Sequence, residues 1–350
     1  MDVLFEEMHG VDGHVGIITL NRPEVLNSLN AAMIAAMYPQ LKVWADAAAI
    51  KAVIIRAAPG RAFCAGGDLR LTHQRYHAKD PALPHFFRDE YQLNRLIHHY
   101  PKPYIALLDG ITMGGGVGIS IHGSHRVATE RLLFAMPETG IGFFPDVGGT
   151  YFLPRLSGRM GYYLGLTGAR LSSDDCVSLT LAQYKVTPSD LPALIEKIAA
   201  TSLKGDAKAI VSHIIAAFKV AIPPSALLEQ QTEIDRCFSF NTMEEVVAAL
   251  STATGPACLA AMGALQKKSP TSLKVTLAAL HQGAALDFDA CMHQEYRLAC
   301  HFTEGHDFIE GIRAVIIDKD QQPKWRPDTL AGVSPQAVAR YFSPTANEPA

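Results

Sequence analysis

The sequence predicts an α/β fold in its first half, followed by a helical region. Up to about residue 190, short apolar runs typical of buried strands alternate with longer segments whose apolar residues have helical spacing. Between residues 190 and 300 the strand-like runs fade, and the chain is rich in Ala and Leu at helical spacing, with breaks at Pro223-Pro224 and Pro270. These observations predict a core over residues 1–188 and a helical C-terminal region over 189–350, with a short, partly irregular tail after 330.

The chain begins with a predicted β-hairpin and a helix. Residues 2–8 and 14–20 have strand character and flank a turn-like stretch at 10–13. Ser28 and Asn30 are candidate helix caps, because their side chains can accept a hydrogen bond from a free backbone N–H. The helix that follows is predicted from apolar residues at helical spacing: Met33, Met37, Leu41 and Trp44.

Strands and helices continue to alternate along the core. We predict a buried strand at 52–56, a helix over about 85–99, and further strands at 104–108 and 125–129. Pairs of strands tend to precede each helix, which suggests a repeated strand-strand-helix unit, although the residues themselves show no repeat.

Two glycine-rich turns each lie between a predicted strand and a helix. They are Ala65-Gly66-Gly67-Asp68 and Met113-Gly114-Gly115-Gly116. Glycine lets a ligand approach the backbone, and the first N–H groups of a helix are free to donate. If the N–H groups of Gly67 and Gly115 point at one spot, they form an oxyanion hole with two donors; the alternative is two packing turns. Neither turn follows the dinucleotide or phosphate-loop motifs.

Residues 136–150 place two carboxylates, Glu138 and Asp146, among apolar residues, glycines and prolines. Carboxylates are seldom left in such surroundings without a partner or a task, because desolvating the ionised form is costly. The pair could act as general base and acid, or as nucleophile and orienting group. The alternative is a helix-capping Glu and a turn Asp. Apolar neighbours and the charge of Glu138 should raise the pKa of Asp146.

Composition excludes several classes of function. The formal net charge is -3, and no Lys/Arg stripe is present, so we expect no nucleic-acid partner. No apolar run reaches the roughly 18 residues of a membrane span, so we expect no membrane partner. The six cysteines form no C-x-x-C pair and the 14 histidines no H-E-x-x-H motif, so we expect no metal site and a reducing compartment. The strand-like, acidic start predicts a cytoplasmic protein without a signal peptide.

Four motifs in order resemble the crotonase (enoyl-CoA hydratase/isomerase) superfamily. They lie at residues 20–23, 63–69, 110–116 and 136–138. The resemblance implies a spiral of strand-strand-helix repeats in which residues 1–188 bind an acyl-CoA thioester, with coenzyme A as part of the substrate and no separate cofactor. It also implies a homo-oligomer, a trimer or a hexamer, unless the long C-terminal region changes this. The implied oxyanion hole is Gly67 and Gly115, beside the implied substrate-binding residues Ala65, Gly66, Asp68 and Gly114.

Within this superfamily the chain most resembles the 3-hydroxyisobutyryl-CoA hydrolase family. The segments that carry this resemblance are 86–91, 111–118, 138–149, 151–156 and 306–325. The resemblance implies that Glu138 and Asp146 are catalytic and that Glu90, at the pocket rim, binds substrate. It also makes Cys64 a packing residue rather than a nucleophile.

One position separates the hydrolase from the hydratase pattern. Hydratases carry a second glutamate just after the glycine triplet, where this chain has Gly118, and Asp146 supplies a second carboxylate further along. The resemblance thus implies hydrolysis of a short 3-hydroxyacyl-CoA, most of all 3-hydroxyisobutyryl-CoA from valine breakdown. The alternatives are an isomerase or lyase of the same superfamily, which needs a single carboxylate, and a non-catalytic acyl-CoA-binding protein.

Overall fold

The structure, a computed structural model, describes residues 1–345 in two compact units. The first unit comprises Met1–Gly67, Gln92–Phe134 and Leu171–Ser225, and the second comprises Asp68–Tyr91, Ala135–Arg170 and the rest of the chain from Ala226. The chain therefore passes between the units several times. The predicted boundary at 188 falls inside the last segment of the first unit, and the division into a core and a C-terminal domain stays a prediction. No helix in the described part of the chain is long and apolar enough to cross a membrane.

A six-stranded sheet is the centre of the first unit. Its strand order is β1-β2-β3-β5-β7-β10, in which β1 and β2 are antiparallel and the other pairs are parallel. Strands of a parallel sheet are buried on both faces, which explains the continuous apolar runs in β3 and β5. The strand bounds are β1 Val3–His9, β2 His14–Leu20, β3 Ile50–Ala57, β5 Tyr104–Leu108, β7 His125–Thr129 and β10 Tyr184–Val186.

Four short strands form a second sheet, in the order β4-β6-β8-β9. In successive repeats the first strand enters the six-stranded sheet and the second enters this one, and a helix follows. The predicted α/β fold with its strand-strand-helix unit is therefore confirmed. The bounds of this sheet are β4 Ala62–Cys64, β6 Ile111–Met113, β8 Leu133–Ala135 and β9 Leu171–Ser172.

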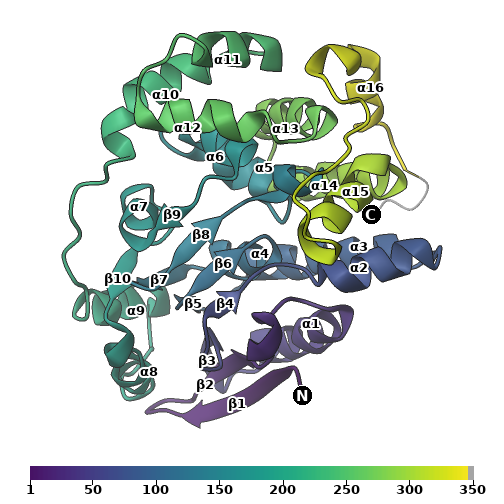
Figure 1. The fold of residues 1–350 in the computed structure, drawn as a ribbon. Coiled ribbons are helices and arrows are strands. Elements are labelled where there is room, and N and C mark those ends of the chain that lie inside the picture. Colours follow the sequence, from purple (N-terminus) through teal and green to yellow (C-terminus); the bar gives the residue numbers. More distant parts are fainter. Residues whose placement is uncertain (346–350) are drawn as a thin grey trace. The chain divides into compact units, whose positions relative to one another are not determined.

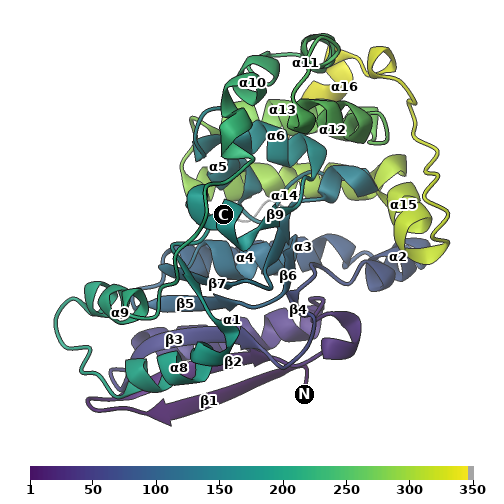
Figure 2. The same ribbon diagram turned by 60° about the vertical axis from the view of Figure 1, so that its left-hand side comes forward.

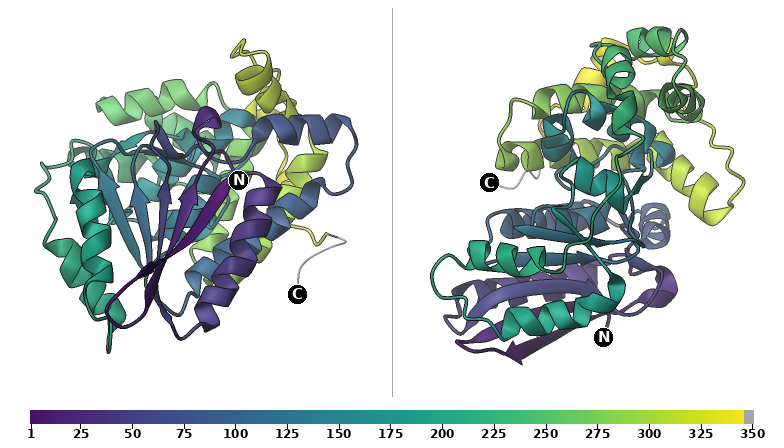
Figure 3. Two further views of the ribbon diagram at one scale, coloured as in Figure 1. Left: turned by 90° about the horizontal axis from the view of Figure 1, so that it is seen from below. Right: turned by 90° about the vertical axis from the view of Figure 1, so that its left-hand side faces the viewer.

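Helices cover both faces of the six-stranded sheet (Figures 2 and 3). Helix α1, Ala31–Asp46, begins at Asn30, whose side chain accepts the Met33 N–H at 2.8 Å, as predicted. Trp44 of α1 packs on β2 where Gly16 has no side chain, since a Cβ there would lie 2.7 Å from the indole. The opposite face packs against α8, Leu191–Ala199, and α9, Ala207–Ala216. The first unit also holds α4 Gly115–Ile121 and α7 Ser173–Ser178.

The second unit is almost entirely helical. Figure 1 shows α10, α12 and α13 gathered around α6. The prediction of a helical region after 190 is confirmed, and Pro270 begins α13 behind the Ser269 cap. A short helix also forms in the tail expected to be irregular; residues 346–350 of that tail lie outside the described chain. The helices are α2 Leu69–His77, α3 Leu83–His98 (shared between the units), α5 Gly149–Phe152, α6 Met160–Thr167, α10 Gln231–Cys237, α11 Met243–Leu250, α12 Pro256–Leu265, α13 Pro270–Gly283, α14 Phe288–Glu304, α15 His306–Ile312 and α16 Pro335–Arg340.

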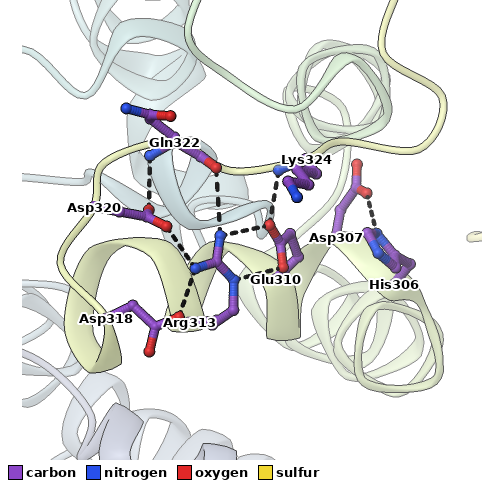
Figure 4. A network of polar contacts seen from close by, with 8 residues as sticks. All are labelled: His306, Asp307, Glu310, Arg313, Asp318, Asp320, Gln322 and Lys324. Carbon is purple, nitrogen blue, oxygen red and sulfur yellow. Dashed lines mark hydrogen bonds and ion pairs between the residues drawn. The ribbon is translucent and has the colours of Figure 1, made fainter.

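An arginine organises the segment after α15 (Figure 4). The Arg313 guanidinium donates to Glu310 at 2.8 and 2.9 Å, and Glu310 also accepts the Lys324 N–H at 2.8 Å. The Arg313 guanidinium also donates to Asp318, to Asp320 and to the carbonyl of Gln322. Single exposed ion pairs contribute little to stability, but a planar guanidinium shared by several acceptors fixes the course of the chain.

Candidate functional site

The structure brings the two glycine-rich turns together within the first unit. They follow β4 and β6, which are parallel neighbours, so both turns lie at the same edge of the small sheet. Gly66 has φ +106°, and a Cβ there would lie 3.3 Å from the carbonyl oxygen of Met113 and 3.8 Å from the amide nitrogen of Gly115. The first turn therefore needs glycine at position 66, because a side chain there would be strained and would crowd the second turn.

The first residue of α4 supplies a backbone N–H that has no acceptor within the helix. Gly115 is the first residue of this helix, so its N–H lies outside the hydrogen-bond ladder of the helix. Gly114 before it has φ 49° and ψ -124°, a conformation open to glycine alone. Cys64 is fully buried, and a Cβ at Gly116 would lie 2.3 Å from its carbonyl oxygen. Cys64 is thus a packing residue, as the resemblance implied.

Two other residues of the first turn have structural contacts. The Ala65 N–H donates to the carbonyl of Leu26 at 3.0 Å. Asp68, the first residue of the second unit, caps α2 by accepting the Leu71 N–H at 3.3 Å. The substrate-binding role implied for both stays a prediction.

The second unit brings three buried carboxyl groups together. Glu138 begins the 3-10 helix Glu138–Ile141, Asp146 lies in the loop beyond it, and Glu90 projects from α3. Their exposed fractions are only 7%, 6% and 2%. The charge of Asp146 raises the pKa of both glutamates, so the three groups are electrostatic neighbours. The predicted catalytic pair and the predicted substrate-binding Glu90 thus share one site.

Burial decides the protonation of this cluster. It raises the pKa of Asp146 from 3.8 to about 7, although a hydrogen bond of 2.7 Å from the Tyr91 hydroxyl favours the ionised form. The direction predicted from its apolar neighbours is confirmed. Burial first, and then the charge of Asp146, raise the pKa of Glu138 and of Glu90 well above the ordinary value. The protons therefore belong to the cluster, which holds at least one of them at neutral pH.

An aromatic cluster supplies the apolar surroundings. Phe143 stacks on Phe308 with ring centroids 4.4 Å apart and on Phe87 at 5.5 Å, while Phe144 stacks on Phe302 at 5.5 Å. Two of these rings belong to the loop between Glu138 and Asp146. The loop therefore anchors itself by aromatic packing and holds its carboxylates away from water.

Two carboxyl oxygens of the site have no hydrogen-bond partner among residues 1–345. They are Oε1 of Glu90 and Oε2 of Glu138, and both are inaccessible to solvent. Leaving a buried polar atom unpaired costs about 1–3 kcal/mol, and such atoms in native proteins call for an explanation. A substrate that brings hydroxyl or water donors would satisfy both oxygens, so the cluster has the chemistry of a binding site as well as of an acid/base centre.

Helices α13 and α15, far along the chain, pack against the segment that carries Glu138 and Asp146. The Ser272 hydroxyl on α13 donates to the carbonyl of Phe143. A Cβ at Gly311 would lie 2.2 Å from the carbonyl oxygen of Ile141, and one at Gly142 would lie 2.4 Å from that of Asp307. Helix α15 thus packs backbone to backbone on the 3-10 helix that carries Glu138, which only glycine permits. Asp307 in turn accepts hydrogen bonds from Ser269 and from the Arg326 N–H.

Three site residues escaped the sequence analysis. Tyr91 donates to Asp146, and its signal was its place beside Glu90 in the segment 86–91. Glu295 on α14 is fully buried and binds the loop just after Asp146. Lys268 lies against Gly140, and burial lowers its pKa to about 8 while Glu138 opposes the shift. Neither Glu295 nor Lys268 stands in a motif, so the sequence carried no signal for them.

The raised pKa of Asp146 predicts a stability cost at neutral pH. Between pH 3.8 and about 7 the native state binds a proton that the unfolded chain has lost, so the free energy of unfolding falls as pH rises. Asp146→Asn removes this cost, and we expect it to stabilise the protein by up to about 4 kcal/mol at pH 8. The gain should shrink as pH falls from about 7 toward 4. Urea unfolding of both proteins across this range is the measurement, and a gain that grows toward acid pH would contradict the assignment.

Among residues 1–345, no group of three or more His, Cys, Asp and Glu side chains is arranged to hold a metal ion.

Comparisons with known proteins give the family. The enoyl-CoA hydratase/isomerase family matches residues 15–342. A protein named 3-hydroxyisobutyryl-CoA hydrolase, mitochondrial, from Danio rerio is 47% identical over 347 residues, which cover 98% of this chain and 89% of that protein. The protein of the same name from Homo sapiens is 46% identical over 335 residues, 94% of this chain and 86% of that one.

Solved structures agree on the fold. A carnitinyl-CoA dehydratase from Mycobacterium thermoresistibile matches with a TM-score of 0.91 and 39% identity, covering 99% of this chain and 98% of the other. An enoyl-CoA hydratase from Rhodobacter sphaeroides matches with a TM-score of 0.88 and 38% identity, covering 98% of each chain. The chain therefore belongs to the enoyl-CoA hydratase/isomerase (crotonase) family, and the similarity to 3-hydroxyisobutyryl-CoA hydrolases that its motifs predicted is confirmed.

Proposed function

We propose that this protein hydrolyses the thioester of a short 3-hydroxyacyl-CoA, with 3-hydroxyisobutyryl-CoA of valine catabolism as its substrate. The observation that carries the proposal is a second buried carboxylate, Asp146, whose charge raises the pKa of Glu138, in a chain with Gly118 where hydratases have an acid. The relatives from Danio rerio and Homo sapiens bear the name of this hydrolase. Coenzyme A is then part of the substrate, and the reaction needs no further cofactor.

Hydrolysis divides the chemistry between the two carboxyls. Because the pair shares a proton near neutral pH, one member is ionised while the other can donate. The ionised carboxylate attacks the thioester carbon, to give an anhydride that water cleaves, or takes a proton from an attacking water. The protonated partner gives its proton to the departing CoA thiolate. Both routes use the same groups and release the free acid and CoA thiol.

The remaining predicted residues bind the substrate. The N–H groups of Gly67 and Gly115 are proposed to stabilise the thioester oxygen as it becomes an oxyanion, and one such donor contributes about 2.7–4 kcal/mol to catalysis elsewhere. The unpaired Oε1 of Glu90 is proposed to bind the 3-hydroxyl group of the acyl chain. The residues proposed to line the substrate beside the glycine turns are Ala65, Gly66, Asp68 and Gly114.

A second candidate function is a hydratase or isomerase. Two solved structures at 38–39% identity carry the names enoyl-CoA hydratase and carnitinyl-CoA dehydratase, which favours this candidate. Addition or removal of water across the Cα–Cβ bond needs two acid/base groups placed about that bond, and Gly118 cannot supply one. Binding of acyl-CoA without catalysis is the weakest candidate, because a non-catalytic protein has no need of a costly buried acid pair.

Competing substrates separate these candidates. We expect the purified protein to release CoA from 3-hydroxyisobutyryl-CoA, measured by reaction of the free thiol, and to hydrate crotonyl-CoA far more slowly, measured by loss of enoyl absorbance. Acetyl-CoA is the control for thioesters that lack the 3-hydroxyl. Hydration faster than hydrolysis would replace the hydrolase by a hydratase, and binding of both substrates with no turnover would leave a binding protein.

The compartment and the assembly of the protein are proposed from the cysteines, the relatives and the family resemblance. We propose a reducing compartment, because none of the six cysteines stands in a C-x-x-C pair. The cytoplasm is the proposed compartment, and the mitochondrial matrix is the alternative, since the named relatives carry the word mitochondrial. A homo-oligomer, as a trimer or a hexamer, is proposed from the resemblance.

A further inference from the structure

Glu295 is a buried carboxylate that the chemistry described above does not use. It is fully buried on α14, and both of its oxygens accept hydrogen bonds from the loop that follows Asp146. Oε2 accepts the Gly148 N–H at 2.7 Å, and Oε1 accepts the N–H of Thr150 at 2.9 Å and its hydroxyl at 2.6 Å. Three donors on one carboxylate favour its ionised form and make these bonds strong.

The loop that Glu295 binds has an unfavourable backbone. Val147 has φ 51° and Gly148 has φ 87°, and the left-handed region is rare for a β-branched residue. Such a conformation persists only where the surroundings over-determine it, and it concentrates at functional sites. The Asp146 side chain immediately precedes this pair of residues. The direction of the Asp146 side chain therefore depends on a turn whose backbone conformation is unfavourable and which other contacts must stabilise.

We propose that Glu295 is the positioning residue of the acid pair: it fixes the strained turn at 147–148 and so aims the Asp146 carboxyl at its place beside Glu138. This inference rests on the proposed hydrolase function. It goes beyond helix capping, in which Glu295 would serve only the short helix α5, because it predicts an effect on the protons of the site.

The electrostatic consequence follows from the groups that face Glu295. They are Asp146 in the loop, Tyr91 on α3 and Cys291 on α14 itself, and each has a pKa raised by burial. Burial and, to a lesser extent, the charge of Asp146 raise the pKa of Glu295 to about 8 against its three hydrogen bonds, so Glu295 carries its negative charge mainly above that pH. The interaction is reciprocal, so a negative Glu295 also holds the proton of the acid pair more tightly.

Glu295→Gln tests the proposal while keeping the shape of the side chain. The amide oxygen can still accept both bonds from Thr150, but the amide NH₂ faces the Gly148 N–H, so one bond is lost. The negative charge that the carboxylate carries at alkaline pH is removed as well. We expect kcat for 3-hydroxyisobutyryl-CoA to fall about a hundredfold, as for misplacement by about 1 Å, with KM nearly unchanged. The limb of the pH–rate profile that reports the acid pair should move to lower pH, by less than one pH unit, because Glu295 is only partly ionised where the pair titrates. Deuterium exchange of the peptide that contains residues 147–150 should accelerate.

Two further variants make the outcome decisive. Glu304→Gln removes the same charge from an exposed position of α14 and should leave kcat, pH profile and exchange unchanged. Thr150→Val removes one hydrogen bond without changing charge, so it should lower kcat several-fold without moving the pH limb downward. Unchanged kcat and pH profile in Glu295→Gln, with only a loss of stability, would reduce Glu295 to a helix cap. If the wild-type protein hydrolyses no thioester, the proposed function fails, and faster exchange in Glu295→Gln still reports whether Glu295 holds the turn.

Discussion

Glu138→Gln is expected to abolish turnover of 3-hydroxyisobutyryl-CoA while substrate still binds. A group that acts as base or nucleophile contributes about two to four orders of magnitude, and the amide can do neither. The substitution keeps the volume and most hydrogen-bonding capacity of a side chain that is only 7% exposed. We therefore expect kcat to fall by about 10² to 10⁴, measured by CoA release, and KM to change by less than about tenfold on the same scale.

The stability of the same variant shows whether the loss is chemical. Burial holds the pKa of Glu138 far above its ordinary value, so the carboxyl costs stability wherever the unfolded chain would ionise it. Glu138→Gln should therefore melt at a higher temperature than the wild type at pH 8. Glu304→Gln, at an exposed position, is the control that should change neither the turnover nor the melting temperature. Retention of more than about a tenth of the wild-type turnover would remove Glu138 from the chemistry.

The elements that the sequence predicted well are those buried on both sides. The strands β2, β5 and β7 occur at 14–20, 104–108 and 125–129 as predicted. The apolar run of β5 is typical of a central parallel strand that is buried on both faces, whereas β7 also carries His125, Arg126 and Thr129. Three-residue strands such as β4 and β6 were missed as separate elements, since so short a run has no periodicity. Their glycine turns were nevertheless recognised, because a positive φ, as at Gly66, restricts the residue itself.

The candidate site was predicted where its residues share a motif. Glu138 and Asp146 lie on one segment, and their apolar neighbours already indicated a raised pKa, which the structure confirms for Asp146. Glu295 could not be predicted, because its task is defined by the N–H groups of Gly148 and Thr150, which lie about 145 residues earlier in the chain. The need for glycine at position 311 could not be predicted either, because it arises from the backbone of Ile141, which packs against Gly311 in the folded chain. Contacts made by backbone atoms leave no pattern of side chains to find.

Substitution of Gly115 is expected to remove activity without removing the fold. Gly115 acts through its N–H at the start of α4, so only a side chain that intrudes on the thioester can affect it. Loss of one oxyanion donor costs about 10² to 10³ in kcat. We expect a graded series in which Gly115→Ala lowers kcat/KM moderately and Gly115→Val abolishes CoA release. Affinity for free CoA should change less than affinity for the acyl thioester.

Two other glycines separate this effect from unfolding. A Cβ at Gly116 would lie 2.3 Å from the carbonyl oxygen of Cys64, so Gly116→Ala should fail by destabilisation, with a lowered melting temperature. A Cβ at Gly263 on α12 meets no atom within 4 Å, so Gly263→Val should retain both fold and activity. Gly115→Val is expected instead to keep a cooperative unfolding transition and to lose turnover, because the thioester is proposed to lie against the Gly115 N–H. A folded Gly115→Val with wild-type kinetics would show that this turn does not bind the thioester, and the oxyanion would then need another pair of donors.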